Sequence, residues 1–282
     1  DCDTFKRASL ALYRAAVEPF MASFDWKEHS ILYIVPDGPL NTVPFEALVS
    51  SGRGDEFEDL EYLLLEVPIA YLPSVSCLRF IRTGEAGYSE RVTNGLSAVL
   101  FGDPAYTVAQ AVPAGGAAMR GLKPNPRTAA LFPRCGHADA GDALPPLMLE
   151  PLPGTRREVE AIASIVNGAG HCECYTGASA LERTVKRLSA NGDLERCRLV
   201  HFATHGLAAG SIAGIVEPGL VLSLYGDDSE DGLLTMSEVL GLRLRADLVT
   251  LSACGSGLAA RNGNENGIAD LSRAFLVAGA RR

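Results

Sequence analysis

The sequence has no hydrophobic run that approaches the roughly 20 residues of a membrane-spanning helix. It also has no block of Lys or Arg, and 34 acidic residues against 25 basic ones give a formal charge of −9. An attraction to nucleic-acid phosphates or to anionic lipid is therefore not expected. The first residues do not have the pattern of a signal peptide. We expect a soluble cytoplasmic protein whose partners are proteins, with no contact to nucleic acid or membrane.

Cysteine is too sparse for a fold held by disulfides. Seven cysteines, an odd number, are scattered over 282 residues, whereas small secreted domains carry dense, even sets of cysteines. Hydrophobic residues make up 47% of the chain, which is enough for a sizeable core. The chain starts without Met and stops shortly after a helical pattern, at Ala-Gly-Ala-Arg-Arg. We expect both ends to be cuts in a longer protein, and cleavage after the final basic pair is one hypothesis for the second cut.

The first half of the chain divides into an ordered part and a connection. Residues 4–20 have apolar residues at helical spacing. Strand patterns follow at 31–35, 67–72 and 96–101. Together these elements predict a compact N-terminal subdomain over residues 1–102. Residues 103–150 are rich in Pro, Gly and Ala without a sustained period, which predicts an irregular linker or loop.

In the second half, residues 151–282, strand and helix patterns alternate. Two helices are predicted to open with capping boxes, one at Ser179 with Glu182 and one at Thr235 with Glu238. The main apolar strand patterns lie near 172–175, 198–203 and 247–252. Such alternation is typical of a mostly parallel sheet with helices on both faces. We therefore predict the α/β fold class.

Two of these strand patterns lead directly into a reactive side chain followed by glycine. Residues 199–203 precede His205, and residues 248–252 precede Cys254. Ligands of open α/β sheets bind at the carboxyl ends of the strands, so both side chains fall where such folds keep active sites. A thiol becomes a strong nucleophile when an imidazole accepts its proton. We identify Cys254 as the candidate nucleophile and His205 as the candidate general base.

The residues beside this dyad suggest how an oxyanion could be stabilised. Glycine after each reactive residue allows main-chain N–H groups to approach a substrate carbonyl. We therefore assign a candidate oxyanion hole to the backbone of Gly206 and Cys254. The dyad residues are 49 positions apart, near the roughly 50 that separate the His and Cys of caspases.

The two dyad segments and several others resemble one known family. Residues 202–206 (Phe-Ala-Thr-His-Gly) and 251–257 (Leu-Ser-Ala-Cys-Gly-Ser-Gly) look like the corresponding stretches of the CHAT family, caspase-like peptidases that are often joined to tetratricopeptide repeats. Further similar stretches lie at 35–40, 44–48, 71–74, 102–104, 152–159 and 267–281. The resemblance therefore extends over nearly the whole chain.

The resemblance implies a caspase-like or separase-like fold whose N-terminal half is a degenerate, non-catalytic subdomain. It also implies a cysteine endopeptidase that cleaves a protein substrate without a cofactor, under the control of a sensor or tetratricopeptide-repeat module, with roles in bacterial defence or regulated cell death. Family members continue past residue 282 with another strand and helix. We expect a second chain or the remainder of this chain to complete that part. Two rival hypotheses remain open, a pseudo-protease scaffold and a cysteine acyltransferase.

The polar loop after Cys254 is either a solvated connection or an activation and specificity loop of the kind that rearranges in caspase-like folds. Ser256 is interpreted as a loop residue near the thiol, because residues 254 and 258, where a nucleophile elbow has glycine, are Cys and Leu. Glu265, Asp270 and Asp231 are candidate acidic groups for a basic substrate side chain. The sequence alone does not choose among the three.

Two further sequence patterns are candidate ligand sites. His171, Cys172 and Cys174 could join Cys135 and His137 in a zinc site, but structural zinc sites commonly use Cys-x-x-Cys spacing. We expect no metal. The glycines at residues 255–257 do not fit a phosphate-binding loop, because no Lys follows them. The strand residue His201 is interpreted as a packed or hydrogen-bonded histidine behind the site.

Overall fold

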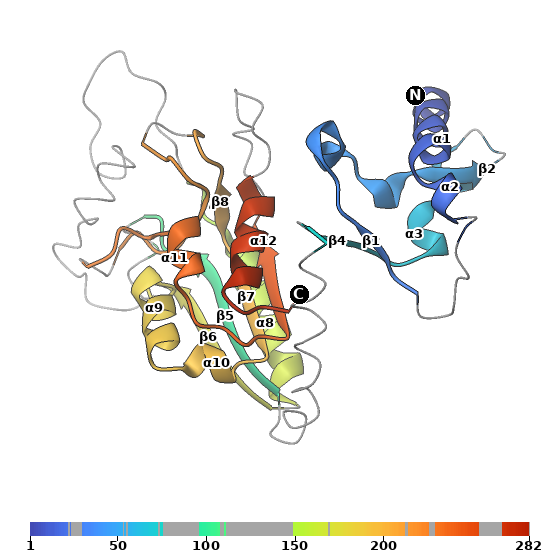
Figure 1. The fold of residues 1–282 in the computed structure, drawn as a ribbon. Coiled ribbons are helices and arrows are strands. Elements are labelled where there is room, and N and C mark those ends of the chain that lie inside the picture. Colours follow the sequence, from blue (N-terminus) through green and yellow to red (C-terminus); the bar gives the residue numbers. More distant parts are fainter. Residues whose placement is uncertain are drawn as a thin grey trace, which may run out of the picture. The chain divides into compact units, whose positions relative to one another are not determined.

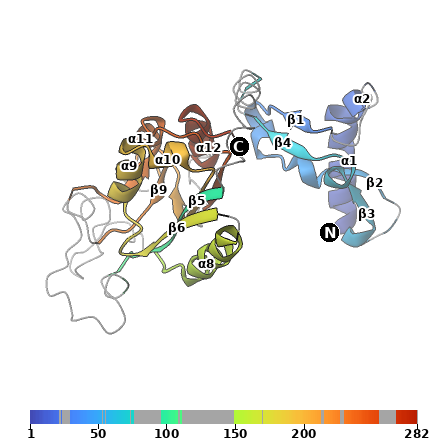
Figure 2. The same ribbon diagram turned by 90° about the horizontal axis from the view of Figure 1, so that it is seen from below.

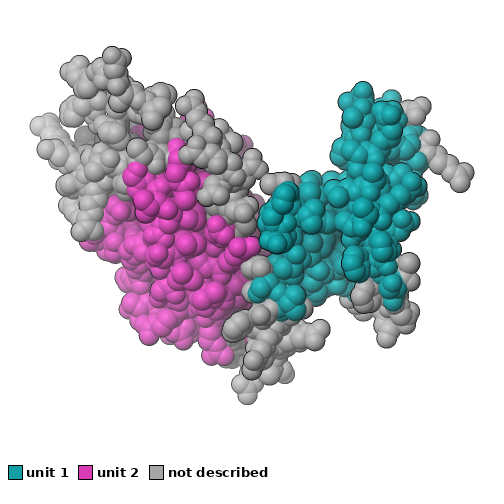
Figure 3. Space-filling model, turned by 45° about the horizontal axis from the view of Figure 1, so that its top comes forward, with its two compact units in different colours: residues 1–80 teal, residues 81–282 magenta. Residues whose placement is uncertain are grey.

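The computed structural model divides the chain into two compact units, residues 1–80 and 81–282 (Figures 1 and 3). None of the helices among the described residues is long and apolar enough to span a membrane. The described residues are 1–21, 23, 30–52, 54, 56–72, 74–75, 96–107, 110, 149–168, 170–211, 214–225, 229–253 and 267–281.

The first unit combines short helices with two small sheets. Its sheets are the parallel pair β1–β4 and the antiparallel pair β2–β3. Its elements are α1 (Cys2–Ala16), α2 (Glu18–Met21), β1 (Leu32–Ile34), η1 (Gly38–Thr42), η2 (Phe45–Ala47), β2 (Val49–Gly52), η3 (Phe57–Asp59), β3 (Leu60–Tyr62), α3 (Leu63–Glu66) and β4 (Ile69–Tyr71). The core of this unit lies under α1, where Tyr13 and Val17 pack with Phe45, Leu48 and Leu63. The predicted helix over residues 4–20 is therefore confirmed as α1, whose inner side carries Tyr13, while the short α2 after it has no buried residue.

The second unit is built on a four-stranded, all-parallel sheet with the order β11-β7-β5-β6. Its elements are β5 (Leu96–Pro104), α8 (Pro153–Asn167), β6 (Gly170–Gly177), α9 (Glu182–Ala190), α10 (Asp193–Arg196), β7 (Leu199–Ala203), β8 (His205–Leu207), β9 (Gly219–Val221), β10 (Leu233–Thr235), α11 (Met236–Leu240), β11 (Leu248–Ser252) and α12 (Gly267–Val277). A mixed α/β fold with a mostly parallel sheet, as the alternating patterns predicted, is confirmed.

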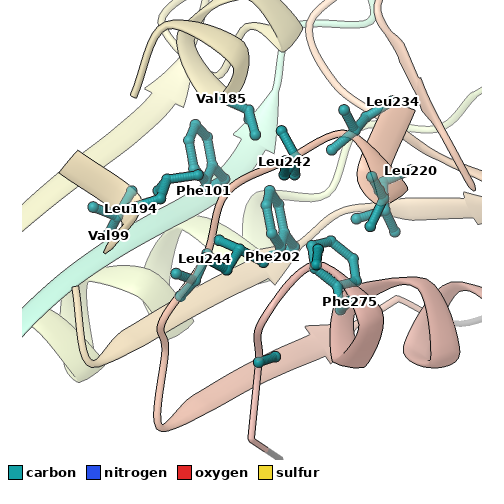
Figure 4. Close-up of a cluster of buried hydrophobic side chains, with 14 of the residues drawn as sticks. Val99, Phe101, Val185, Leu194, Phe202, Leu220, Leu234, Leu242, Leu244 and Phe275 are labelled. Carbon is teal, nitrogen blue, oxygen red and sulfur yellow. The ribbon is translucent and has the colours of Figure 1, made fainter. Parts of the chain in front are cut away.

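Helices cover both faces of this sheet (Figure 2). On one face, Val159 and Val166 of α8 pack on Ala98 and Leu100 of β5. On the other face, the rings of Phe101 and Phe202 stack with centroids 5.1 Å apart, and Phe275 of α12 follows at 5.5 Å from Phe202 (Figure 4). Burial of such aromatic side chains dominates core energetics. Alternate residues of β5 and β7 thus face opposite layers, which explains their continuous apolar sequences.

Three short strands form a separate antiparallel sheet with the order β10-β9-β8. In this sheet His205 lies opposite Val221, and Val221 lies opposite Leu233. The sequence pattern did not predict the sheet as such, because strands of three residues are too short to show a period. Its importance is positional, since β8 begins two residues after β7 ends and carries His205.

Two local features differ from the predicted ones. The strand pattern at 96–101 was assigned to the N-terminal subdomain, but β5 lies at the centre of the second unit's sheet between β6 and β7. The predicted capping box at Ser179 is wrong. The side chain of Ser179 bonds to the main chain of Thr176, and α9 begins at Glu182 after Leu181, which makes no side-chain cap. The second capping box, Thr235 with Glu238, is confirmed.

Candidate functional site

The candidate general base His205 lies at the carboxyl edge of the parallel sheet. Strand β7 ends at Ala203, and His205 begins β8. The neighbouring strand β11 ends at Ser252, which is paired in register with Ala203. Cys254 and Gly255 lie outside the described residues. Strand β7 is buried over most of its length, whereas β11 is the edge strand of the sheet and is half-buried to exposed. Ligands of open α/β sheets bind beyond the carboxyl ends of the strands, and this is where His205 lies.

The ring of His205 is held by a main-chain carbonyl. Its Nε2 lies 2.8 Å from the carbonyl oxygen of Glu150, and the residue is 9% exposed. A carbonyl oxygen only accepts hydrogen bonds, so this contact requires the proton on Nε2. In the neutral imidazole, the other ring nitrogen, Nδ1, then carries a lone pair. The hydrogen bond to Glu150 thus selects the tautomer in which Nδ1 can accept a proton.

Tyr106 supports His205 from the other side. The ring centroids are 5.2 Å apart, and Tyr106 Oη accepts a hydrogen bond of 3.3 Å from the His205 main-chain N–H. The same hydroxyl lies 2.8 Å from Thr204 Oγ1 and donates to the carbonyl of Val221 at 3.1 Å. Thr204 Oγ1 also donates to that carbonyl. Burial raises the pKa of Tyr106, so its hydroxyl remains a neutral hydrogen-bonding group.

Tyr106 and Glu150 are the two site residues that the sequence interpretation missed. Both fall in residues 103–150, which were predicted to be an irregular linker. Tyr106 lies two residues after the end of β5, and Glu150 lies three residues before the start of α8. The available signal for Tyr106 was a large aromatic residue two positions after a buried strand. No side-chain signal exists for Glu150, because its main-chain oxygen makes the contact.

The other predicted site residues are placed as follows. Gly206 lies in β8, buried, opposite Leu220. Asp231 is half-buried before β10, where its Oδ1 accepts a hydrogen bond from the Leu233 main-chain N–H at 2.9 Å. Asp270 lies in the first turn of α12, with Oδ1 3.4 Å from Arg273 Nη1. Ser256 and Glu265 lie outside the described residues. Asp231 lies two residues before Leu233, which is paired with Val221, the residue that is also paired with His205.

His201 lies on the opposite face of β7 from Phe202. It is 3% exposed, with Nε2 3.1 Å from Glu158 Oε1 of α8. Burial lowers its pKa, although Glu158 acts in the opposite direction. His201 is therefore a packed residue between sheet and helix, in agreement with its interpretation from the sequence.

One group of carboxylates is close enough to hold a cation. Glu182, Glu230 and Glu238 converge on one point, and Lys186 Nζ occupies it, at 2.6, 2.8 and 2.7 Å respectively. Burial raises the pKa of Glu182 to about 8, and the ammonium group of Lys186 works against that rise. The cation of this cluster is therefore the lysine of the chain itself.

The residues considered for a zinc site are only partly described. Cys172 and Cys174 lie on one face of β6 with their Sγ atoms 3.8 Å apart. His171 lies beside Glu173, with Nε2 3.5 Å from Glu173 Oε1. Side chains alternate along a strand, so His171 and the two thiols belong to different faces. Cys135 and His137 lie outside the described residues.

Comparison with known proteins gives one finding. A family model described as the CHAT domain matches residues 6–282. No curated protein and no solved structure matches the chain.

Proposed function

The chain belongs to the CHAT domain family of caspase-like cysteine peptidases, and from this premise we propose that it is an endopeptidase with Cys254 as nucleophile and His205 as general base. The observation that carries the proposal is the register of β11 and β7. Ser252 is paired with Ala203, and each candidate residue follows its paired strand residue by two positions. Chain connectivity keeps the Cα of Cys254 within about 7.6 Å of that of Ser252.

The hydrogen bond between His205 and Glu150 supports the role of the histidine. With the proton on Nε2, Nδ1 is available to take the proton of the Cys254 thiol. The imidazolium that results keeps its Nε2–H on the Glu150 carbonyl, whose dipole stabilises the positive charge. A main-chain oxygen here supplies the orienting contact that a carboxylate supplies in other hydrolytic sites.

The proposed reaction proceeds through a thioester. The Cys254 thiolate attacks the scissile carbonyl carbon, while the main-chain N–H groups of Gly206 and Cys254 donate to the oxyanion. His205 returns its proton to the leaving amine as the peptide bond breaks. Water then attacks the thioester, giving one proton to His205 and its hydroxyl group to the acyl carbon. The proton passes to the Cys254 sulfur as the carboxylic acid product leaves.

The biological setting of this activity is proposed by analogy with the family alone. We place the enzyme in the cytoplasm, acting on one protein substrate. A sensor or tetratricopeptide-repeat module outside these 282 residues would switch it on, in bacterial defence or regulated cell death.

Cleavage of peptide libraries tests the proposal. The chain is incubated with a library varied at the residue before the scissile bond, beside the variants Cys254→Ala and His205→Ala and the control Cys197→Ala. Cys197 is a buried cysteine in the hydrophobic core, two residues before β7. We expect cleavage by the wild type and the control, and loss of at least about 10³-fold in both dyad variants. Equal turnover in wild type and Cys254→Ala would refute the proposal.

A further inference from the structure

The carbonyl that orients His205 belongs to a short segment, residues 149–152, that is fixed at both ends. At its start, Leu149 is buried in the hydrophobic cluster that also contains Tyr106 and Leu207. At its end, Leu152 packs against the same cluster. The Glu150 carbonyl lies between these two anchors. Its position against His205 therefore depends on how firmly each end is held.

The hydroxyl of Thr155 holds the second of these ends, Leu152, in place. Thr155 Oγ1 donates to the carbonyl of Leu152 at 2.8 Å, and the Thr155 main-chain N–H donates to the same oxygen at 2.9 Å. The hydroxyl oxygen also accepts a hydrogen bond of 2.7 Å from the main-chain N–H of Asp103. One side chain thus joins the start of α8, the segment 149–152 and the end of β5.

The partner of Thr155 on β5 is held in an unusual backbone conformation. Asp103 has φ = 44°, and it is the only non-glycine residue with positive φ among those described. Such a conformation is strained for a residue with a side chain and persists only when its surroundings fix it. Arg156 fixes the side chain, because its Nε lies 2.9 Å from Asp103 Oδ2 and its Nη1 lies 3.0 Å from Thr176 Oγ1.

The contact between Thr155 and Asp103 depends on close packing of β5 against α8 at Gly102. A Cβ atom there would lie 2.6 Å from Val159 Cγ2 and 2.9 Å from the Thr155 carbonyl oxygen. The glycine thereby lets β5 approach the first turns of α8. This approach brings the Asp103 N–H within reach of the Thr155 hydroxyl.

We propose that Thr155 is a positioning residue that sets the tautomer of His205 through the segment 149–152. The Thr155 hydroxyl holds Leu152, Leu152 holds the Glu150 carbonyl in place, and that carbonyl keeps the His205 proton on Nε2. The catalytic consequence rests on the proposed function. The structural consequence, a single tautomer in the resting protein, does not depend on it.

The test compares Thr155→Val with Thr155→Ser in the full chain. Valine keeps the shape of threonine but loses the hydroxyl, and serine keeps the hydroxyl. Imidazole ¹⁵N shifts of histidine-labelled protein report the tautomer, and the His205 signals are identified by their loss in His205→Gln. We expect one Nε2–H tautomer in the wild type and in Thr155→Ser, and a mixture with Nδ1–H in Thr155→Val. With a cleaved peptide, kcat should fall about tenfold or more in Thr155→Val with little change in KM.

Ser164→Ala is the matched control. Ser164 lies in the same helix, and its hydroxyl donates to a carbonyl three residues earlier, Ala161, at 2.7 Å. It should leave the tautomer and kcat unchanged. A Thr155→Val protein with the wild-type His205 spectrum would overturn the inference. A shifted tautomer in a protein that cleaves nothing would support it while refuting the proposed function.

If Thr155→Val does not fold, Arg156→Gln provides the second variant. The Arg156 side chain is 44% exposed, so its replacement carries little folding risk. The loss of the Asp103 contact should shift the tautomer in the same direction by a smaller amount. An unchanged His205 spectrum in Arg156→Gln would then count against the inference.

Discussion

At the residue scale, His205 is restrained at two different points. The Glu150 carbonyl holds its ring, and the Tyr106 hydroxyl accepts a hydrogen bond from its main chain. Tyr106 also connects β5 with β9, because its hydroxyl donates to Val221. A histidine at a strand end would otherwise have several rotamers and both tautomers. These two contacts turn a common residue type into a candidate base of defined orientation.

Tyr106→Phe tests the second restraint. Removal of the hydroxyl leaves the buried His205 N–H without its acceptor, so we expect a loss of about 1–3 kcal/mol in the free energy of unfolding. We also expect a clear decrease in kcat on a cleaved peptide. Denaturant unfolding and steady-state kinetics measure the two effects.

Tyr62→Phe is the matched control, since the Tyr62 hydroxyl donates to the Phe57 carbonyl at 3.0 Å in the first unit. An equal decrease of kcat in both variants would contradict a specific role for Tyr106.

Residue types explain which part of the site the sequence could predict. His205 was predicted as a site residue because it is an imidazole and follows a buried strand. Glu150 could not be predicted, because its contact is made by a main-chain carbonyl oxygen, which every residue type has. Tyr106 could not be assigned either, because its partners Thr204 and Val221 lie about a hundred positions along the chain. Cys254 stays a prediction from the sequence.

At the element scale, a partly buried ionic cluster joins α9, α11 and the segment before β10. Lys186 of α9 contacts Glu182 in its own helix, Glu238 in α11 and Glu230 near β10. Glu182 also accepts a hydrogen bond from the main-chain N–H of Gly232 at 2.8 Å. The cluster thus holds the segment that carries Asp231.

Lys186→Met removes the only cation that the structure describes at the centre of this cluster. An uncompensated buried charge is strongly destabilising, so we expect a loss of about 3 kcal/mol at pH 8. The loss should be smaller at pH 5. A carboxyl such as Glu182, whose pKa in the fold is raised to about 8, destabilises the fold as the pH rises from its unfolded value near 4.3 through that pKa. Without the lysine, this destabilisation should extend to higher pH.

Denaturant unfolding at the two pH values measures the effect, and Lys6→Met is the control. Lys6 donates to a main-chain carbonyl, Gly54, in the first unit, so its replacement should have no such pH dependence. A Lys186→Met penalty that is equal at pH 5 and pH 8 would contradict the account of this cluster.

Local hydrogen bonds explain why some elements were predictable. Helix α11 was predicted correctly, because Thr235 and Glu238 form a capping box with each other. Helix α9 was not placed correctly, because Glu182 bonds to Lys186 and Gly232 and does not cap its own helix. A local motif predicts structure only when no distant partner competes for the same side chain.

At the scale of the whole molecule, each unit has its own buried clusters among the described residues. The sheet of the second unit includes β5, although nearly fifty residues separate it from α8. Hydrophobic patterns predicted β5 as a strand. They did not predict which strands it pairs with, since strand pairing is decided by long-range packing. The parallel direction of the strands and the helix layers on both faces were predictable because alternating strands and helices permit few arrangements. The resemblance to the CHAT family is confirmed by the family model.

The central claim is that Cys254 and His205 act as one unit, and the pH dependence of alkylation tests it most directly. The rate at which iodoacetamide modifies Cys254 is measured by mass spectrometry of its peptide, in the wild type and in His205→Ala. We expect the wild-type rate to stay high well below the pKa of a free thiol, about 8.5. In His205→Ala the rate should fall with pH as for a free thiol. Identical profiles in the two proteins would contradict the account.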